Sequence, residues 1–181
     1  SLRSIPNLFV VRPCDAIETF EAWEFAIQNL NSPTALILSR QNLPLIRHDY
    51  KENKLNKGAY FLRQFEGSKF SIISTGSEVS LALKVHDFYM SKKIKSNVVS
   101  MPSMELFNKQ STIYQKKILG TKPKVIIEAA SSFGWHKYIN HNDLLVSIDN
   151  FGESGKGNEL FDFFGFNSNN IIRLIKKNIL T

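Results

Sequence analysis

The sequence predicts an α/β fold: a three-layer, mostly parallel sheet with helices on both faces, preceded by a partial α/β unit. Two observations predict it. Short apolar runs typical of buried strands alternate with helical patterns, and most connections are long enough to cross over between parallel strands. Because parallel sheets bury both faces, we expect helices on each side. The runs are residues 8–11, 34–38, 58–62, 70–74, 97–101, 124–128 and 144–148.

The composition supports a folded protein and excludes two classes. The chain has 181 residues, of which 43% are hydrophobic and 12% aromatic, so it can bury a sizeable core and is neither disordered nor collagen-like. We find no apolar run of transmembrane length and no secretory signal at the start. The single cysteine, Cys14, excludes an internal disulfide and suits a reducing compartment. We therefore expect a cytoplasmic protein without a membrane partner.

The net charge of +7 raises the question of nucleic-acid binding, because clustered cations attract phosphates. The lysines are poorly clustered. Doublets at 92–93, 116–117 and 176–177 are isolated near the ends of helical patterns, where cations suit the helix dipole. We favour a solvated surface over a nucleic-acid patch and expect no nucleic-acid partner.

The first 40 residues predict one strand-helix-strand unit. Asp15 begins a helix, with Glu18 at capping-box spacing, and residues 32–33, Ser-Pro, end it. A helix between two apolar runs predicts a parallel crossover, but one helix cannot cover a sheet. We expect this unit to rely on the rest of the chain or another chain for cover. The predicted apolar face comprises Ile17, Phe20, Trp23, Ile27 and Leu30.

A polar stretch separates this unit from a second domain. It extends through residues 44–57, and we place a linker at 48–57 between a unit at 1–47 and a domain at 58–181. Thr75 to Glu78 opens a helix, short helices extend to about residue 119, and residues 170–180 form a closing helix. The predicted stripe of the first helix is Val79, Ala82, Leu83, His86 and Met90, and that of the closing helix is Ile171, Ile172, Ile175 and Ile179.

Two acidic patterns could carry chemistry. Asp15, Glu18, Glu21 and Glu24 recur every three residues, which brings neighbouring carboxylates together on a helix and could indicate a metal site. No further ligand is evident, so we favour a solvated helix face. The segment 75–78, Thr-Gly-Ser-Glu, could bind an anion through backbone N–H groups, but its capping-box spacing favours a helix cap.

The histidines and the cysteine give weak signals. His48, His86, His136 and His141 lack an identifiable nucleophile or carboxylate partner, and His86 lies on a predicted helix stripe, where we expect a packed histidine. Cys14 lies at a helix start, a position that can lower a thiol pKa, but without a matching base we favour a structural thiol.

Arg40 has the strongest local case for ligand binding. It follows residues 34–39 and so lies at the carboxyl end of a predicted parallel strand, the edge where open α/β sheets bind ligands. Its guanidinium matches phosphate oxygens in charge and geometry. From the residues alone, a structural salt bridge and a phosphate clamp remain equally open.

Collinear blocks along nearly the whole chain resemble the transketolase family. Residues 34–44, TALILSRQNLP, resemble the family's segment around S-R-Q-N-L, and residues 74–79 and 99–103 resemble A-T-G-S-E-V and V-S-M-P-S. Gly155-Lys156 departs from the family's usual Ala-Pro, which puts the geometry of that loop in doubt. Further matches are Gly58-Ala59-Tyr60, Glu128-Ala129, Phe133-Gly134-Trp135, Lys137-Tyr138, Phe151-Gly152-Glu153-Ser154, Leu160-Phe161 and Phe164-Gly165-Phe166.

The resemblance implies a homodimeric transferase of the pentose phosphate pathway. Such enzymes use thiamine diphosphate and Mg²⁺ to move a two-carbon ketol unit from a ketose phosphate to an aldose phosphate. Residues 1–47 resemble only the end of the pyrimidine-binding domain, and 58–181 resemble the C-terminal domain. The family's cofactor, metal and catalytic motifs lie upstream, so we expect none here. Only the arginine that holds the substrate phosphate maps onto this chain, at Arg40.

Three hypotheses follow. The first is the C-terminal part of a transketolase, inactive without its missing N-terminal portion. The second is a non-catalytic dimerisation or regulatory module, against which the retained S-R-Q-N segment counts. The third is part of another thiamine diphosphate enzyme, such as dihydroxyacetone synthase or deoxyxylulose-phosphate synthase.

Overall fold

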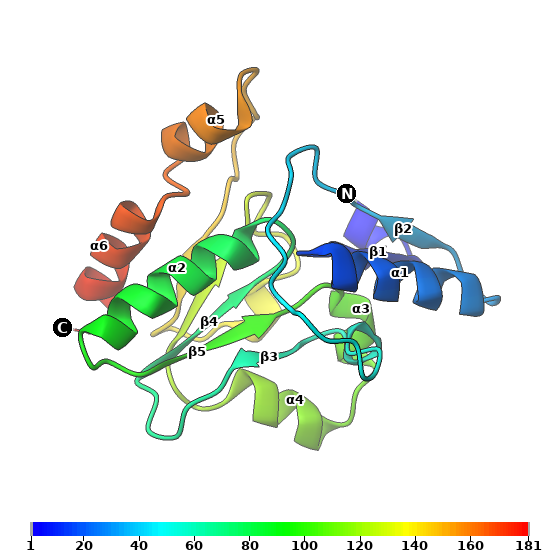
Figure 1. Cartoon of the computed structure of the whole chain (residues 1–181), viewed down its shortest axis with the longest axis horizontal. Helices are drawn as coiled ribbons and strands as arrows, with labels where there is room; N and C mark the ends of the chain where they lie inside the picture. Colours follow the sequence, from blue (N-terminus) through cyan, green and yellow to red (C-terminus); the bar gives the residue numbers. More distant parts are fainter. Residues whose placement is uncertain (1, 181) are drawn as a thin grey trace.

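Two separate sheets organise the computed structural model, which describes residues 2–180 (Figure 1). The smaller sheet pairs β1 (Phe9–Val11) with β2 (Thr34–Leu36) in parallel, and α1 (Ala16–Gln28) connects them. A 3₁₀ turn, η1 (Leu2–Ser4), precedes β1. The predicted strand-helix-strand unit is therefore confirmed, although both strands are shorter than their apolar runs.

The larger sheet has five strands in the order β3-β5-β4-β6-β7. Strands β5, β4, β6 and β7 are parallel to one another, and β3 pairs antiparallel with β5 at one edge. The predicted mostly parallel α/β fold is therefore confirmed. Another 3₁₀ turn, η2 (Leu55–Lys57), precedes β3. The strands are β3 (Tyr60–Arg63), β4 (Phe70–Ser74), β5 (Ser96–Ser100), β6 (Lys124–Ile127) and β7 (Leu144–Val146).

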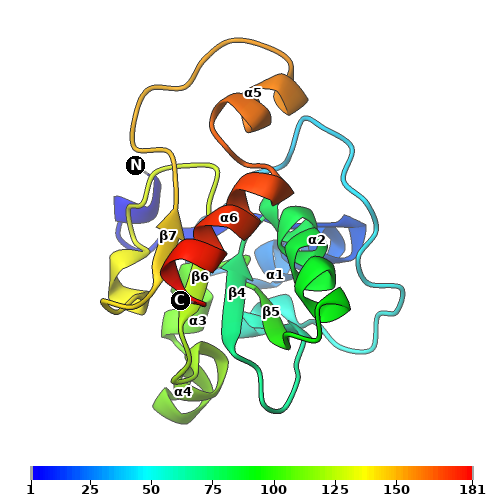
Figure 2. The same ribbon diagram turned by 90° about the vertical axis from the view of Figure 1, so that its left-hand side faces the viewer.

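Helices cover both faces of the larger sheet. On one face lie α2 (Glu78–Ser91) and α6 (Ser168–Asn178), which are adjacent in Figure 2. On the other lie α3 (Met104–Asn108), α4 (Thr112–Leu119) and the 3₁₀ turn η3 (His136–Tyr138). A short helix, α5 (Gly157–Phe163), lies away from the sheet and was not expected.

Alternation along the strands produces the two hydrophobic cores. Ile72 packs with α2 and α6, whereas its neighbour Ile73 packs with α3, α4 and η3. Val98 and Val99 divide in the same way on β5. Successive side chains of a strand point to opposite faces, so a fully apolar run serves a sheet buried on both sides.

The apolar stripes were predicted with unequal success. On α2, Val79, Ala82 and His86 are buried as expected, but Leu83 and Met90 are only half-buried. Three α2 residues that were not predicted complete the buried face: Leu81, Val85 and Tyr89. The α6 stripe is confirmed at Ile171, Ile172 and Ile175, and Lys176 and Lys177 lie in its last turn as expected.

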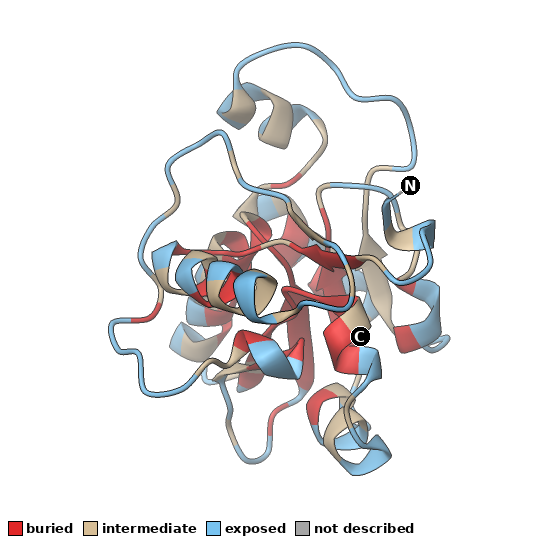
Figure 3. Ribbon diagram, turned by 90° about the vertical axis from the view of Figure 1, so that its right-hand side faces the viewer, coloured by how far each residue is buried: buried red, intermediate tan, exposed pale blue. Residues whose placement is uncertain are grey.

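The predicted apolar face of α1 is present, but it does not pack against the rest of the chain. Phe20, Trp23, Ile27 and Leu30 are 57%, 53%, 70% and 89% exposed, whereas Glu18, Glu21 and Ala22 are fully buried. The side of the molecule that carries α1 faces the viewer in Figure 3. The helical period was read correctly, but the acidic side of the helix, not the aromatic side, faces the rest of the chain.

A third hydrophobic cluster joins the small unit to the larger domain. It contains Phe9 and Val11 of β1, Ala22 of α1, Leu55 of η2 and Leu106 of α3. Residues 1–47 thus rely on the rest of the chain for part of their cover, as the sequence predicted. No helix within residues 2–180 has the length and apolar character needed to cross a membrane.

Gly58 follows the connecting segment, which is residues 37–57 between β2 and the larger domain. This glycine allows a close approach of two backbones. Its φ is +72°, and a Cβ there would lie 2.0 Å from the Phe107 nitrogen and 2.5 Å from the Ser103 carbonyl oxygen. Gly67 has φ +73° but would meet nothing within 4 Å. A comparison of substitutions at the two glycines therefore distinguishes the cost of backbone strain from the cost of steric overlap.

We expect Gly58→Ala to lower the free energy of unfolding by roughly 4 kcal/mol or more, because neither backbone can give way. Gly67→Ala should cost only about 1–2 kcal/mol, the strain of a left-handed alanine. Urea denaturation followed by circular dichroism measures both. Similar losses in the two variants would contradict the steric argument.

Candidate functional site

A cavity of about 230 Å³ lies where several parallel strands end. Arg12 follows β1, residues 37–41 follow β2, residues 76–78 follow β4, and Ala129 follows β6, and all of them line the cavity. The carboxyl ends of strands from both sheets thus meet at one place. Arg40 lines this cavity with an exposed side chain.

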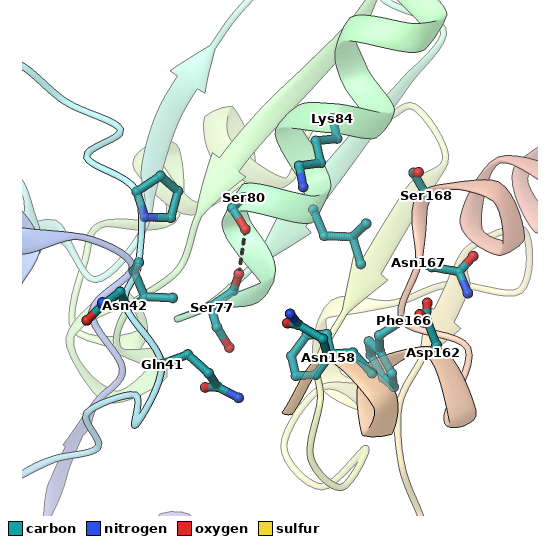
Figure 4. A pocket seen from close by; sticks show the side chains of 14 residues that line it. Gln41, Asn42, Ser77, Ser80, Lys84, Asn158, Asp162, Phe166, Asn167 and Ser168 are labelled. Carbon is teal, nitrogen blue, oxygen red and sulfur yellow. Dashed lines mark hydrogen bonds between the residues drawn. The ribbon is translucent and has the colours of Figure 1, made fainter. Parts of the chain in front are cut away.

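Two neighbouring cavities border the same segment. The larger, about 490 Å³, shares Gln41, Ser77 and Phe161 with the Arg40 cavity and lies between residues 41–44, α2 and the α5–α6 region (Figure 4). A third cavity, of about 250 Å³, shares Ser39 and Gln41 with the Arg40 cavity. The Ser39 hydroxyl accepts from the Gln41 amide at 3.1 Å, which holds this turn between the three cavities.

Arg12 connects the walls of the Arg40 cavity. Its guanidinium donates to Glu78 at 3.2 and 3.3 Å and also to Glu128. Both carboxylates are fully buried, and Glu128 also accepts from Arg3 at 2.9 Å and from the Trp135 indole at 2.8 Å. We did not single out Arg12 from the sequence, although it follows an apolar run just as Arg40 does.

The turn before α2 is neither a capping box nor an open anion site. Ser77 is the N-cap and makes no side-chain cap bond, while Glu78 pairs with Arg12 and accepts from the Ala129 amide at 3.2 Å. The capping-box prediction is therefore wrong. The Gly76 amide donates to the Arg12 carbonyl at 3.1 Å, which uses one donor that an anion would need.

Glu18 and Glu21 of α1 are fully buried, so the predicted solvated face is wrong for both. Glu18 accepts from the hydroxyls of Tyr60 and Ser100, both at 2.6 Å, and from the Cys14 amide at 2.7 Å. Burial nevertheless raises the pKa of the Glu18 carboxyl. A carboxylate in this position connects α1 to β3 and β5 of the larger domain.

Asp15 and Glu21 also bind distant backbone. Asp15 caps α1 through the Glu18 amide at 2.7 Å and accepts from the Arg47 amide at 2.9 Å. Glu21 accepts from the amides of residues 54 and 55, both at 3.2 Å. Glu24, half-buried, accepts from Asn53 at 2.7 Å. These acids fix the connecting segment against α1 rather than ligating a metal.

Cys14 and the histidines occupy ordinary structural positions. Cys14 is buried, and burial raises its thiol pKa, which agrees with the structural thiol we favoured. His86 is buried 2.8 Å from the Ser96 hydroxyl and stacks on Phe65, and burial lowers its pKa. The other three histidines are exposed.

These features define an open α/β protein with cavities at the carboxyl edge of its parallel strands, where such proteins bind ligands. Residues 58–167 match the family model of the transketolase-like C-terminal domain, and residues 1–46 match that of the transketolase pyrimidine-binding domain. The chain belongs to the transketolase family.

Curated relatives are similar over almost the whole chain. A transketolase of Cereibacter sphaeroides is 41% identical over 180 residues, covering 99% of this chain and 27% of the relative. One of Streptococcus pyogenes is 43% identical over 181 residues, covering 97% of this chain and 25% of the relative. The chain therefore spans about a quarter of the length of these relatives.

Solved structures agree. A transketolase mutant of Pichia stipitis in complex with fructose 6-phosphate matches with a TM-score of 0.89 at 36% identity, covering 99% of this chain and 26% of that one. A transketolase of Leishmania mexicana gives 0.88 at 36%, with the same coverage. A split-gene transketolase described as an inactive β4 tetramer gives 0.80 at 18%, covering 99% and 60%, which shows the fold alone.

The described residues do not fit the metal ion that the resemblance implies. Within residues 2–180, no group of three or more His, Cys, Asp or Glu side chains could hold a metal ion. The buried carboxylates already accept from protein donors. We assign no residue of this chain to thiamine diphosphate or Mg²⁺.

The raised pKa of Glu18 predicts a pH-dependent stability. The folded state holds this proton above the ordinary value of 4.5, so its contribution is complete below that pH and is lost as pH rises through the raised pKa. We expect the wild type to lose stability relative to Glu18→Gln as the pH rises from the ordinary value of 4.5 through the raised pKa of the folded state.

Denaturant titrations of both proteins across this range measure their free energies of unfolding. In the difference between the two values, the contributions of other titrating groups cancel. A stability difference that stays constant with pH would contradict the raised pKa.

Proposed function

We propose that this chain is the C-terminal part of a thiamine diphosphate-dependent transketolase, which transfers a two-carbon ketol unit from a ketose phosphate to an aldose phosphate. Two family matches in the order expected of such an enzyme support the proposal. The relatives named transketolase are about four times as long, so the cofactor and Mg²⁺ would be held by the missing N-terminal portion. The complete protein would be a cytoplasmic homodimer in the pentose phosphate pathway.

Within this chain, Arg40 would bind the substrate phosphate. The observation that carries this role is its position in the cavity at the carboxyl edge, with an exposed guanidinium. No carboxylate of residues 2–180 forms an ion pair with Arg40, whereas Arg12 beside it is held by Glu78 and Glu128. Of the two arginines, only Arg40 has its charge available to a ligand.

The exposed face of α1 supports a missing N-terminal portion. Phe20, Trp23 and Ile27 form an apolar face beside a sheet of only two strands, and such a face is normally covered. We propose that residues 1–47 end a pyrimidine-binding domain whose earlier part covers it. Residues 48–57 would be the linker and 58–181 the C-terminal domain.

Two other functions remain as alternatives. A non-catalytic dimerisation or regulatory module would need no available Arg40. Another thiamine diphosphate enzyme, such as dihydroxyacetone synthase, would share the fold, and only assays with different donors on the complete protein separate it from transketolase.

In the complete enzyme, Arg40→Ala should lower kcat/KM for phosphorylated substrates by roughly ten- to a hundredfold, because it removes charge-assisted bonds to phosphate. A donor without phosphate should lose far less. Arg173→Ala, which removes an exposed arginine of α6, is the matched control. Equal losses on both kinds of donor would indicate a structural role for Arg40.

Residues 1–181 alone should neither transfer ketol groups nor bind thiamine diphosphate with micromolar affinity, because the cofactor would be held by the missing portion. Calorimetry with the cofactor and Mg²⁺ tests this. Tight binding by the chain alone would refute the division between the two portions. Activity that appears when the missing portion is added would support it.

A further inference from the structure

A fourth cavity, of about 300 Å³, lies between the connecting segment and β3. It is lined by residues 46–49, Lys54 and residues 60–63, and it shares none of them with the cavities around Arg40. Its volume is at the lower end of the range for small-molecule sites. The proposed function gives it no role.

Cations dominate the lining of this cavity. Arg47, Lys54 and Arg63 face one lining carboxylate, Asp49, which is itself 3.7 Å from the amino group of Lys51. Within residues 2–180, neither Lys54 nor Arg63 forms an ion pair with a carboxylate. Two positive charges at this cavity therefore lack a protein counter-charge.

Arg47, the third cation of the lining, is buried and already faces a carboxylate. Its side chain is only 7% exposed, and its NH2 nitrogen lies 2.8 Å from Glu21 Oε2. Nε and NH2 make no aligned hydrogen bond among the described residues, but both nitrogens are shielded from solvent, so a ligand in the cavity does not contact them. The ring of Tyr60 lies 5.2 Å from the guanidinium carbon and offers it no acceptor oxygen.

We propose that this cavity binds a phosphate group, either inorganic phosphate or the phosphate of a small ester. A phosphate dianion balances the charges of Lys54 and Arg63. Its oxygens also accept charge-assisted hydrogen bonds from these two side chains. A carboxylate carries half the charge and would leave one cation unbalanced. Binding would join the connecting segment, which provides Lys54, to β3, which provides Arg63.

Calorimetric titration of the 181-residue chain with inorganic phosphate at low ionic strength tests the proposal. We expect saturable binding that Lys54→Gln and Arg63→Gln each weaken by about tenfold, the effect of losing one charge-assisted contact. Lys92→Gln, which removes an exposed lysine at the end of α2, should bind phosphate as the wild type does. Glycerol phosphate in place of phosphate shows whether the cavity accepts an ester.

Two further variants locate the bound phosphate. Arg47→Lys keeps the charge opposite Glu21, and it should leave phosphate binding close to that of the wild type because the nitrogens at that contact are not open to the cavity. Arg40→Ala should leave this binding unchanged. If Arg40→Ala abolishes it and Arg63→Gln does not, the phosphate binds at the Arg40 cavity and the proposal is overturned. Absence of saturable binding, or equal weakening by Lys92→Gln, also overturns it.

Discussion

The ion pairs of Arg12 with Glu78 and Glu128 are the interaction on which the arrangement of the two units depends. Both carboxylates are fully buried, one at the start of α2 and one just after β6. A buried carboxylate without a cation is costly, so the larger domain needs the guanidinium that β1 delivers. Because these residues also line the Arg40 cavity, the shape of that cavity depends on the docking of the small unit.

The acids of α1 complete this junction from the other side. Glu18 reaches β3 and β5, and Asp15 and Glu21 hold the backbone of the connecting segment. Hydrogen bonds from several donors offset the cost of burying these groups. The interface is therefore largely directional and polar, and the small cluster around Leu55 adds apolar contact. Such an interface fixes one relative orientation of the units more strictly than an apolar surface would.

Much of the fold could be predicted because its strands are buried on both faces. Fully apolar runs such as Ile72-Ile73 and Val98-Val99 are sufficient signals, and the observed strands begin and end within two residues of the predicted runs. The antiparallel pairing of β3 depends on which edge of the sheet is free, which no local pattern encodes. The short helix α5 was missed because it buries no residue and so has no apolar stripe.

The site was predicted less well, and the reason is physical. Arg40 could be found because one rule, the carboxyl edge of a parallel strand, places it. The burial of Glu18 could not be found, since its partners Tyr60 and Ser100 lie 42 and 82 residues away in the sequence. Acidic residues on a helix are usually solvated, and only the tertiary structure shows that these are not. For the same reason, the sequence did not reveal which face of α1, the acidic or the aromatic one, packs against the rest of the chain.

The family match and the ion pairs of the buried carboxylates give different boundaries for the larger domain. The family match begins at residue 58, but the counter-charges of Glu78 and Glu128 come from Arg3 and Arg12, far upstream of it. Evolution could therefore recombine this domain with another partner only if the new neighbour supplied equivalent guanidinium groups. A segment that keeps its buried carboxylates paired would have to include Arg3 and Arg12, so it is larger than the region that the family model matches.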